Sequence, residues 1–183
     1  MTSAGSARGR RHALIVAILA AFIFLTGVIS APSLMDDVDG AHATIARNML
    51  RSGDWVIPTL DGIKYLDKAP LQFWMIAATY RVFGIHDWAA RLPLALLTIV
   101  LCWIVALFGN WAFGPPAGLY AGLVITTCVG LFLFTRVLIP DSILTLLVTG
   151  AMWGMLRALD DDEKRPWLWS NLAALSMGLS LLV

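Results

Sequence analysis

The stretch that decides the fold is residues 92–135, LPLALLTIVLCWIVALFGNWAFGPPAGLYAGLVITTCVGLFLFT, which contains no charged side chain. A helix needs about 20 apolar residues to cross a bilayer core of roughly 30 Å, so this stretch is long enough for two crossings. Gly109-Asn110 and Gly114-Pro115-Pro116 are strong helix stoppers, and they predict that the break between the two crossings lies at these residues. Because only helices and closed barrels satisfy their backbone in lipid, and this run is too long for barrel strands, the sequence predicts an all-α, multi-span membrane protein.

Apolar runs continue on both sides of this stretch. Residues 13–35 carry no charge, and we expect them to form the first span. This run is longer than the apolar region of a cleaved signal peptide, which is about 7–15 residues, so we expect a retained anchor. Residues 92–159 are expected to hold the second, third and fourth spans. A charged loop follows at 160–166, and residues 167–183 begin a fifth span, where the chain is expected to be truncated.

The charges give the chain a predicted direction. Arg8, Arg10 and Arg11 precede the first span, and the positive-inside rule places them, with residues 1–12, in the cytoplasm. Counting spans then puts residues 36–91 on the outer, periplasmic face and the 160–166 loop inside. The expected location is the cell inner membrane.

Composition excludes other classes of protein. The chain is 59% hydrophobic and 14% charged, whereas a soluble domain carries about 25% charged residues. Its net charge is +1, and the sequence has no basic stripe with interleaved aromatic residues, so no nucleic-acid partner is expected. A transporter component is the alternative among membrane proteins. Against it, the predicted spans hold almost no charge at their centres, where translocation sites usually place some.

The outer segment, residues 36–91, differs from the spans around it. Apolar residues at helical spacing predict a helix that ends near Gly53, Trp55 to Pro58 suggests an extended stretch, and Asp61-Gly62 suggests a turn. Residues 71–80 are apolar but too short to span, so we expect them to lie in the membrane interface. The segment therefore predicts interfacial helices folded over the outer membrane face.

Acidic residues predicted on the outer face are the candidate site residues. Span counting places on one side of the membrane Asp36, Asp37 and Asp39 of the outer segment and Asp141 in a short turn between two later spans, which are the catalytic candidates, together with Asp67, a substrate-binding candidate. A carboxylate there can act as general base toward an acceptor hydroxyl or amine, and Lys68 can neutralise a departing lipid phosphate. The structural alternatives are that Asp37, Asp39 or Asp141 caps a helix, and that Lys68 is an ordinary interfacial lysine. His42 faces the same surface, but a lone histidine is rarely a ligand.

The outer segment also resembles a known family. The residues that carry the resemblance run from Asp36-Asp37-Val38-Asp39 through IARNMLRSGDWVIP (45–58) to LDGIKYLDKAPLQFW (60–74), with Phe83-Gly84, Arg91-Leu92-Pro93 and Pro140-Asp141. They are similar to the first outer loop of bacterial aminoarabinose transferases of lipid A and, more distantly, of protein O-mannosyltransferases. The resemblance covers residues 13–160.

The resemblance implies a GT-C type glycosyltransferase that moves a sugar, with inversion, from a polyprenyl-phosphate donor at the outer face. It implies that Lys68 binds the lipid phosphate, that Asp67 precedes it in an acidic-lysine pair, and that Asp141 is a second outer-loop acid. Tyr65 joins the substrate-binding candidates. A gapless match places Val38 and Asp39 at the family's acidic pair, and a one-residue shift places Asp37 first, so Asp36, Asp37 and Asp39 all remain candidates. Asp67 stands where glutamate is common, and Ala69 where proline is.

The same resemblance leaves the partners open. The expected donor is a polyprenyl-phosphate sugar, and the acceptor is lipid A-like, another glycolipid or a protein. A divalent metal beside Asp67 or Asp141 is an open option, because the spacing defines no ligand set. The family has many more spans than this chain, so we expect the N-terminal part of the enzyme, inactive alone. A truncated fragment without activity is the remaining alternative.

Overall fold

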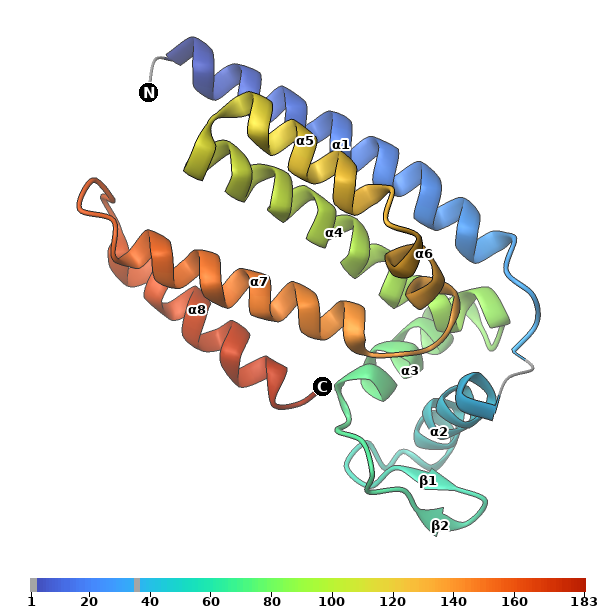
Figure 1. The fold of residues 1–183 in the computed structure, drawn as a ribbon. Helices are drawn as coiled ribbons and strands as arrows, with labels where there is room; N and C mark the ends of the chain where they lie inside the picture. Colours follow the sequence, from blue (N-terminus) through green and yellow to red (C-terminus); the bar gives the residue numbers. More distant parts are fainter. Residues whose placement is uncertain (1–2, 35–36) are drawn as a thin grey trace.

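The computed structural model of the chain describes residues 3–34 and 37–183; Asp36, one of the candidate acids, lies outside the described residues. Five longer helices and one short helix form a bundle (Figure 1), and they are α1 (Ser3–Ile29), α4 (Asp87–Phe113), α5 (Pro115–Thr126), α6 (Val129–Arg136), α7 (Asp141–Ala158) and α8 (Pro166–Ser180). Helix α1 packs along α4 and α5, and the α7–α8 hairpin packs against α4 through α7.

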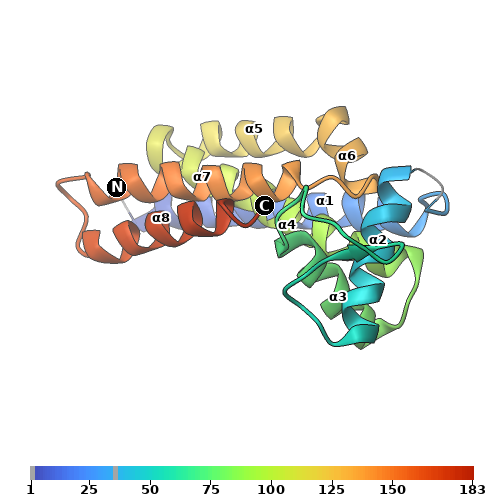
Figure 2. The same ribbon diagram turned by 90° about the horizontal axis from the view of Figure 1, so that it is seen from below.

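The remaining elements form a cap, residues 37–83, at one end of the bundle (Figure 2). The cap consists of α2 (Asp37–Ser52), β1 (Thr59–Leu60), β2 (Ile63–Lys64) and α3 (Leu71–Phe83). Its core joins apolar side chains of α2 and α3 to the first turns of α4, including Ala46, Ile76, Tyr80 and Leu94. The chain start, the α4–α5 turn and the α7–α8 loop all lie at the opposite end of the bundle.

Helices α4 and α5 approach closely because glycines line their contact. A Cβ on Gly109 would lie 2.8 Å from the Gly118 Cα, and a Cβ on Gly118 would run into the Ala106 carbonyl and the Asn110 side chain. The prediction that Gly109-Asn110 breaks the helix is therefore wrong. Helix α4 continues to Phe113 and turns at Gly114, whose φ is +94°; Asn110 is buried and donates from Nδ2 to the Gly9 carbonyl at 2.9 Å.

Two helices are long and apolar enough to cross a membrane, Ala7–Ile29 and Asp87–Phe113, and α5 with α6 makes a third if the pair is one span bent by 50°. The bend, at Thr127 and Cys128, was not predicted. Helix α1 ends at Ile29, before the expected limit of 35, and α4 begins at Asp87 rather than 92. Helices α7 and α8, of 18 and 15 residues, do not meet the same criteria, so their crossings stay predictions.

Pro93 lies inside α4 and removes the N–H that would bond the Ala89 carbonyl. The cap offers a donor in its place, because the Thr79 hydroxyl of α3 lies 2.8 Å from that carbonyl and shares its single proton between it and the Ile76 carbonyl of its own helix, also at 2.8 Å. The packing of α3 on α4 thus allows a proline inside a long helix.

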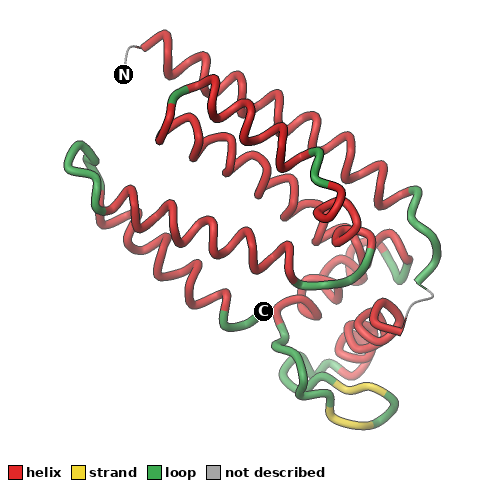
Figure 3. Tube along the Cα trace, viewed as in Figure 1, coloured by secondary structure: helices red, strands yellow, loops and turns green. Residues whose placement is uncertain are grey.

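Glycines set the two turns of the cap. Helix α2 ends as predicted at Gly53, which has a φ of +74° and donates its N–H to the Met49 carbonyl. Asp61 and Gly62, with φ of +51° and +80°, form the predicted turn, which joins β1 to β2 (yellow in Figure 3). Positive φ at both positions is the mark of a type I′ hairpin turn, for which Asp-Gly is a favoured pair. The strand pairing begins at Thr59, so the extended stretch lies just after the predicted 55–58.

Candidate functional site

Five of the candidate residues line one cavity at the junction of cap and bundle. The cavity holds about 580 Å³, and the candidates in its wall are Asp37, Tyr65, Asp67, Lys68 and Asp141. They come from three places: the start of α2, the loop between β2 and α3, and the start of α7. Val38, Ala41, His42, Ile139 and Pro140 complete the wall. One amine and three carboxylates thus line a common space. Asp141 lies more than 70 residues after Lys68 in the sequence.

Asp37 lies between two cavities. It is the first residue of α2, is exposed, and also lines an adjoining cavity of about 400 Å³ that reaches the hairpin at Leu60 and Asp61. Of the residues that the structure describes, only Asp37 and Ala41 line both spaces. A carboxylate in this position can contact one molecule in each cavity at once.

Asp39, two residues later, has a different environment. Its side chain is buried and forms an ion pair with Arg91, whose Nη2 lies 3.2 Å from Oδ2. Its Oδ1 accepts the Leu138 N–H at 2.6 Å. Both carboxylate oxygens are therefore engaged by the protein, and Asp39 is not part of the cavity wall. Its position inside α2 also excludes the capping alternative for this residue.

One residue of the α6–α7 turn, Leu138, is held through both of its backbone polar groups by side chains of the cap. Besides the Leu138 N–H, which Asp39 binds, the Leu138 carbonyl accepts from His42 Nδ1 and from Gln72 Nε2, both at 2.7 Å. Because a carbonyl can only accept, His42 carries its proton on Nδ1. These bonds attach the turn that leads to Asp141 to the helices that carry the other candidates.

Arg91 joins the same junction from the bundle side. Its Nε donates to the Arg136 carbonyl at 2.7 Å and its Nη1 to the Pro32 carbonyl at 2.8 Å, in addition to the Asp39 pair. Buried arginine is expensive unless every donor is matched with an acceptor. Arg91 therefore ties together α4, α2, the end of α6 and the segment that follows α1.

The substrate-binding candidates lie on the loop before α3. Lys68 and Asp67 are exposed, and neither makes an ion pair with another described residue. Tyr65 is half-buried, with its ring edge-on to Phe73 at 6.3 Å between centroids, and its N–H donates to the Pro58 carbonyl. The His42 ring also lies edge-on to Phe73, with 5.4 Å between the ring centroids. Phe73 thus supports two residues of the cavity wall.

Asp141 begins α7 but does not cap it. The N-cap position is held by Pro140, and no side chain there bonds the helix N–H groups. The capping alternative for Asp141 is therefore wrong, and its exposed carboxylate remains in the cavity wall. Its charge is favoured by the positive end of the α7 dipole.

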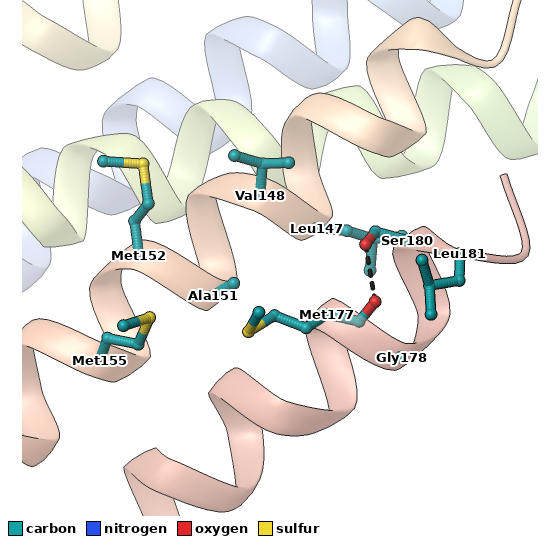
Figure 4. A pocket seen from close by; sticks show the side chains of 9 residues that line it. All are labelled: Leu147, Val148, Ala151, Met152, Met155, Met177, Gly178, Ser180 and Leu181. Atoms are coloured by element: carbon teal, nitrogen blue, oxygen red, sulfur yellow. Dashed lines mark hydrogen bonds between the residues drawn. The ribbon is translucent and has the colours of Figure 1, made fainter.

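A separate cavity of about 430 Å³ lies between α7 and α8 (Figure 4). Its walls are apolar, with three methionines, and include no titratable side chain. It offers no acid or base. No group of three or more His, Cys, Asp or Glu within residues 3–34 and 37–183 is arranged to hold a metal ion.

The family of the chain follows from comparison with known proteins. Residues 67–183 match the family described as dolichyl-phosphate-mannose-protein mannosyltransferase. The chain belongs to this family. Proteins with similar sequences include an undecaprenyl phosphate-alpha-4-amino-4-deoxy-L-arabinose arabinosyl transferase 1 of Proteus mirabilis (strain HI4320), 30% identical over 68% of this chain and 23% of its own length. A protein of the same name from Sodalis glossinidius (strain morsitans) is 27% identical over 90% of this chain and 31% of its own length.

Two solved structures share the fold. The crystal structure of ArnT from Cupriavidus metallidurans in the apo state superposes with a TM-score of 0.85 at 23% identity, covering 92% of this chain and 32% of that one. The same protein bound to undecaprenyl phosphate gives 0.82 at 24% identity, over 92% and 31%. The predicted multi-span helical membrane fold is thereby confirmed. The matched regions make up 23% and 31% of the two transferases, so the chain corresponds to less than a third of their length.

The sequence alone did not reveal the residues that hold the site together. In the sequence, Arg91 and Gln72 stand out only as part of the resemblance, and His42 only as a lone histidine. The sequence does hold one signal for Arg91, which is its position directly before 44 uncharged residues. Because α4 begins at Asp87, Arg91 lies inside the helix, and its charge must find partners inside the protein.

Proposed function

We propose that this chain forms the outer-face end of the active site of a glycosyltransferase that uses a polyprenyl-phosphate-linked sugar. The observation that carries the proposal is the single cavity lined by Asp37, Lys68 and Asp141. Membership of the mannosyltransferase family and the names of the aminoarabinose transferases support the class of donor.

Lys68 is the residue we assign to the donor phosphate. Its ammonium lines the cavity, is exposed, and has no ion-pair partner among the described residues. When the bond between the anomeric carbon and the phosphate oxygen breaks, the electron pair stays on the phosphate, and a fixed cation lowers the energy of that charge. Asp67 and Tyr65 lie beside it and bind the sugar.

Asp37 is the residue we assign as general base. The acceptor enters the adjoining cavity, Asp37 removes its proton, and the acceptor oxygen or nitrogen attacks the anomeric carbon from the side opposite the phosphate. The products are an inverted glycoside and the free polyprenyl phosphate, and the proton stays on the Asp37 carboxyl. Asp39 holds the framework and has no free oxygen for this step. Asp141 is placed to bind the sugar from α7.

The acceptor class stays broader than the donor class. A lipid A-like glycolipid, another glycolipid and a protein all present the hydroxyl or amine that this step needs. The inner membrane, with the cap on the periplasmic face, is the proposed location, because α1 and α4 can span a membrane and α1 begins with a basic cluster.

Sugar transfer in membranes tests the proposal. The full-length protein and its Asp37→Asn variant, at matched abundance, receive radiolabelled polyprenyl-phosphate sugars, and product is counted. General-base removal lowers rates by about 10²–10⁴-fold, and we expect a loss in this range for Asp37→Asn. Asp161→Asn is the control, because Asp161 is an exposed aspartate of the α7–α8 loop that lines neither cavity. Full activity in Asp37→Asn would rule out the assignment of the base.

A further inference from the structure

The end of the bundle away from the cap carries a further cavity, which is lined by basic side chains. It holds about 550 Å³ and is lined by Ala7, Arg8, Arg11, His12 and Ile15, all on α1 (Figure 1, beside the N-terminus). Residues three and four apart lie on one face of a helix, so Arg8, Arg11 and His12 form a single cluster. Arg10, between them in sequence, is exposed and is not part of this wall.

This part of α1 is held in place by two contacts with the α4–α5 turn. Asn110 Nδ2 donates to the Gly9 carbonyl at 2.9 Å, and His12 Nδ1 donates to the Pro115 carbonyl at 3.1 Å. Gly9 is buried, and a Cβ there would already touch the Asn110 side chain at 3.4 Å. The arginines therefore project from a docked helix turn and not from a free tail.

The arginines are available to a ligand. Within the described residues, neither Arg8 nor Arg11 forms an ion pair, and the cavity wall contains no acidic side chain. Two unpaired guanidinium groups facing one hollow favour an anion, and a phosphate oxygen pair matches their planar geometry.

The position of the cluster along the membrane span indicates which kind of anion it binds. The uncharged run of α1 begins at Ala13, directly after the cluster, and Ile15 closes the cavity on the apolar side, so the cluster lies where the predicted span meets the membrane surface. Lipid headgroups lie at this boundary between water and hydrocarbon. We propose that Arg8, Arg11 and His12 form a binding site for the phosphate headgroup of an anionic phospholipid in the leaflet opposite the cap.

Lipid titration by native mass spectrometry tests the site. The full-length protein in neutral detergent is titrated with phosphatidylglycerol and, separately, with phosphatidylcholine. Arg8 and Arg11 would each lose a direct charge-assisted hydrogen bond to the phosphate, so Arg8→Gln and Arg11→Gln should each weaken phosphatidylglycerol binding by more than about tenfold. Arg10→Gln removes the same charge from the same turn but no contact in the cavity, so it should weaken binding by about fivefold at most. Phosphatidylcholine should bind weakly to all four proteins.

Three outcomes would overturn the proposal. Equal weakening by Arg10→Gln would mean that the positive potential of the helix end, and not this cavity, attracts the lipid. Unchanged binding in Arg8→Gln and Arg11→Gln would remove the site altogether. Displacement of the lipid by excess inorganic phosphate would show a free anion as the ligand. Circular dichroism of each variant establishes that the helices remain folded, so a change in affinity reports on the side chain.

Discussion

Arg91 and Asp39 form a buried ion pair across the junction of bundle and cap, with 3.2 Å between Nη2 and Oδ2. Removing one partner of a buried pair leaves an unmatched charge, which costs about 3–5 kcal/mol. We expect Asp39→Ala to lower the free energy of unfolding by this amount. Chemical denaturation of the detergent-purified protein measures it. Glu163→Gln breaks the other ion pair, Arg157–Glu163, in the charged loop and should have a much smaller effect; an equal effect would contradict a special role for the Arg91 junction.

Lys68→Ala should lower kcat/KM for the polyprenyl-phosphate donor by about 10²-fold or more, because the departing phosphate loses its fixed cation. Lys68→Arg keeps the charge and should recover part of the rate. Lys64→Ala is the matched control, since Lys64 is an exposed lysine of β2 that does not line the cavity. Initial rates against donor concentration give the values, and a Lys64→Ala loss as large as that of Lys68→Ala would point to general surface charge instead.

Thr79→Val should destabilise the protein by about 1–3 kcal/mol, because the Ala89 carbonyl opposite Pro93 then loses its donor inside the protein. Thr79→Ser keeps the hydroxyl and should come close to the parent. Thermal unfolding of the three proteins compares them directly. Similar losses in both variants would assign the effect to the methyl group and its packing.

Gly118→Ala should disrupt the contact of α5 with α4, because the new methyl group meets the Ala106 carbonyl and the Asn110 side chain. Gly130→Ala places the same group on α6, where only the Cys128 Sγ lies within 4 Å, at 3.9 Å. Since Ala is favoured over Gly in a helix by roughly 0.5–1 kcal/mol, Gly130→Ala should be neutral or stabilising. The midpoints of thermal unfolding should therefore move in opposite directions, and a fall in both would mean that the packing argument is wrong.

Burial, with a smaller contribution from Asp87, raises the pKa of Tyr80 from 10.0 to about 12. The folded protein keeps this proton where the unfolded chain has lost it, so the stability that Tyr80 contributes is complete below pH 10 and is lost as pH rises toward 12. Tyr80→Phe should flatten the decline of stability in this window. Tyr120→Phe, at an exposed tyrosine of α5, should not. Denaturation at a series of pH values checks the difference.

Apolar length and turn residues predicted the helical part of the fold well. Gly53 and Asp61-Gly62 end a helix and make a hairpin through their own backbone preferences, which depend little on distant residues. Asn110 shows where such local reasoning fails. A polar residue after a glycine indicates the end of a helix, but the Asn110 side chain donates a hydrogen bond to the Gly9 carbonyl, about a hundred positions away in the sequence. Gly109, which has no side chain, allows α5 to pack closely on α4. The bend between α5 and α6 at Thr127 likewise has no signal in the local sequence.

The candidate site divides in the same way. Span counting placed Asp37, Lys68 and Asp141 on one side, and all three line one cavity. The sequence could not separate Asp37 from Asp39, because neighbouring acids look alike until their surroundings are known. The partners that distinguish them, Arg91 and Leu138, lie 52 and 99 residues from Asp39.

Leu138 is held through its N–H by Asp39 and through its carbonyl by His42 and Gln72, and this has a mechanical consequence for the wall of the cavity. Transmembrane helices tilt when the bilayer thickens or thins around them. A helix whose first residue follows an immobilised turn can swing only at its far end, so the pivot of α7 coincides with Asp141. The spacing between that carboxylate and Lys68 is thereby insulated from the lipid, and the membrane can deform around the bundle while the charges facing the cavity keep their separation.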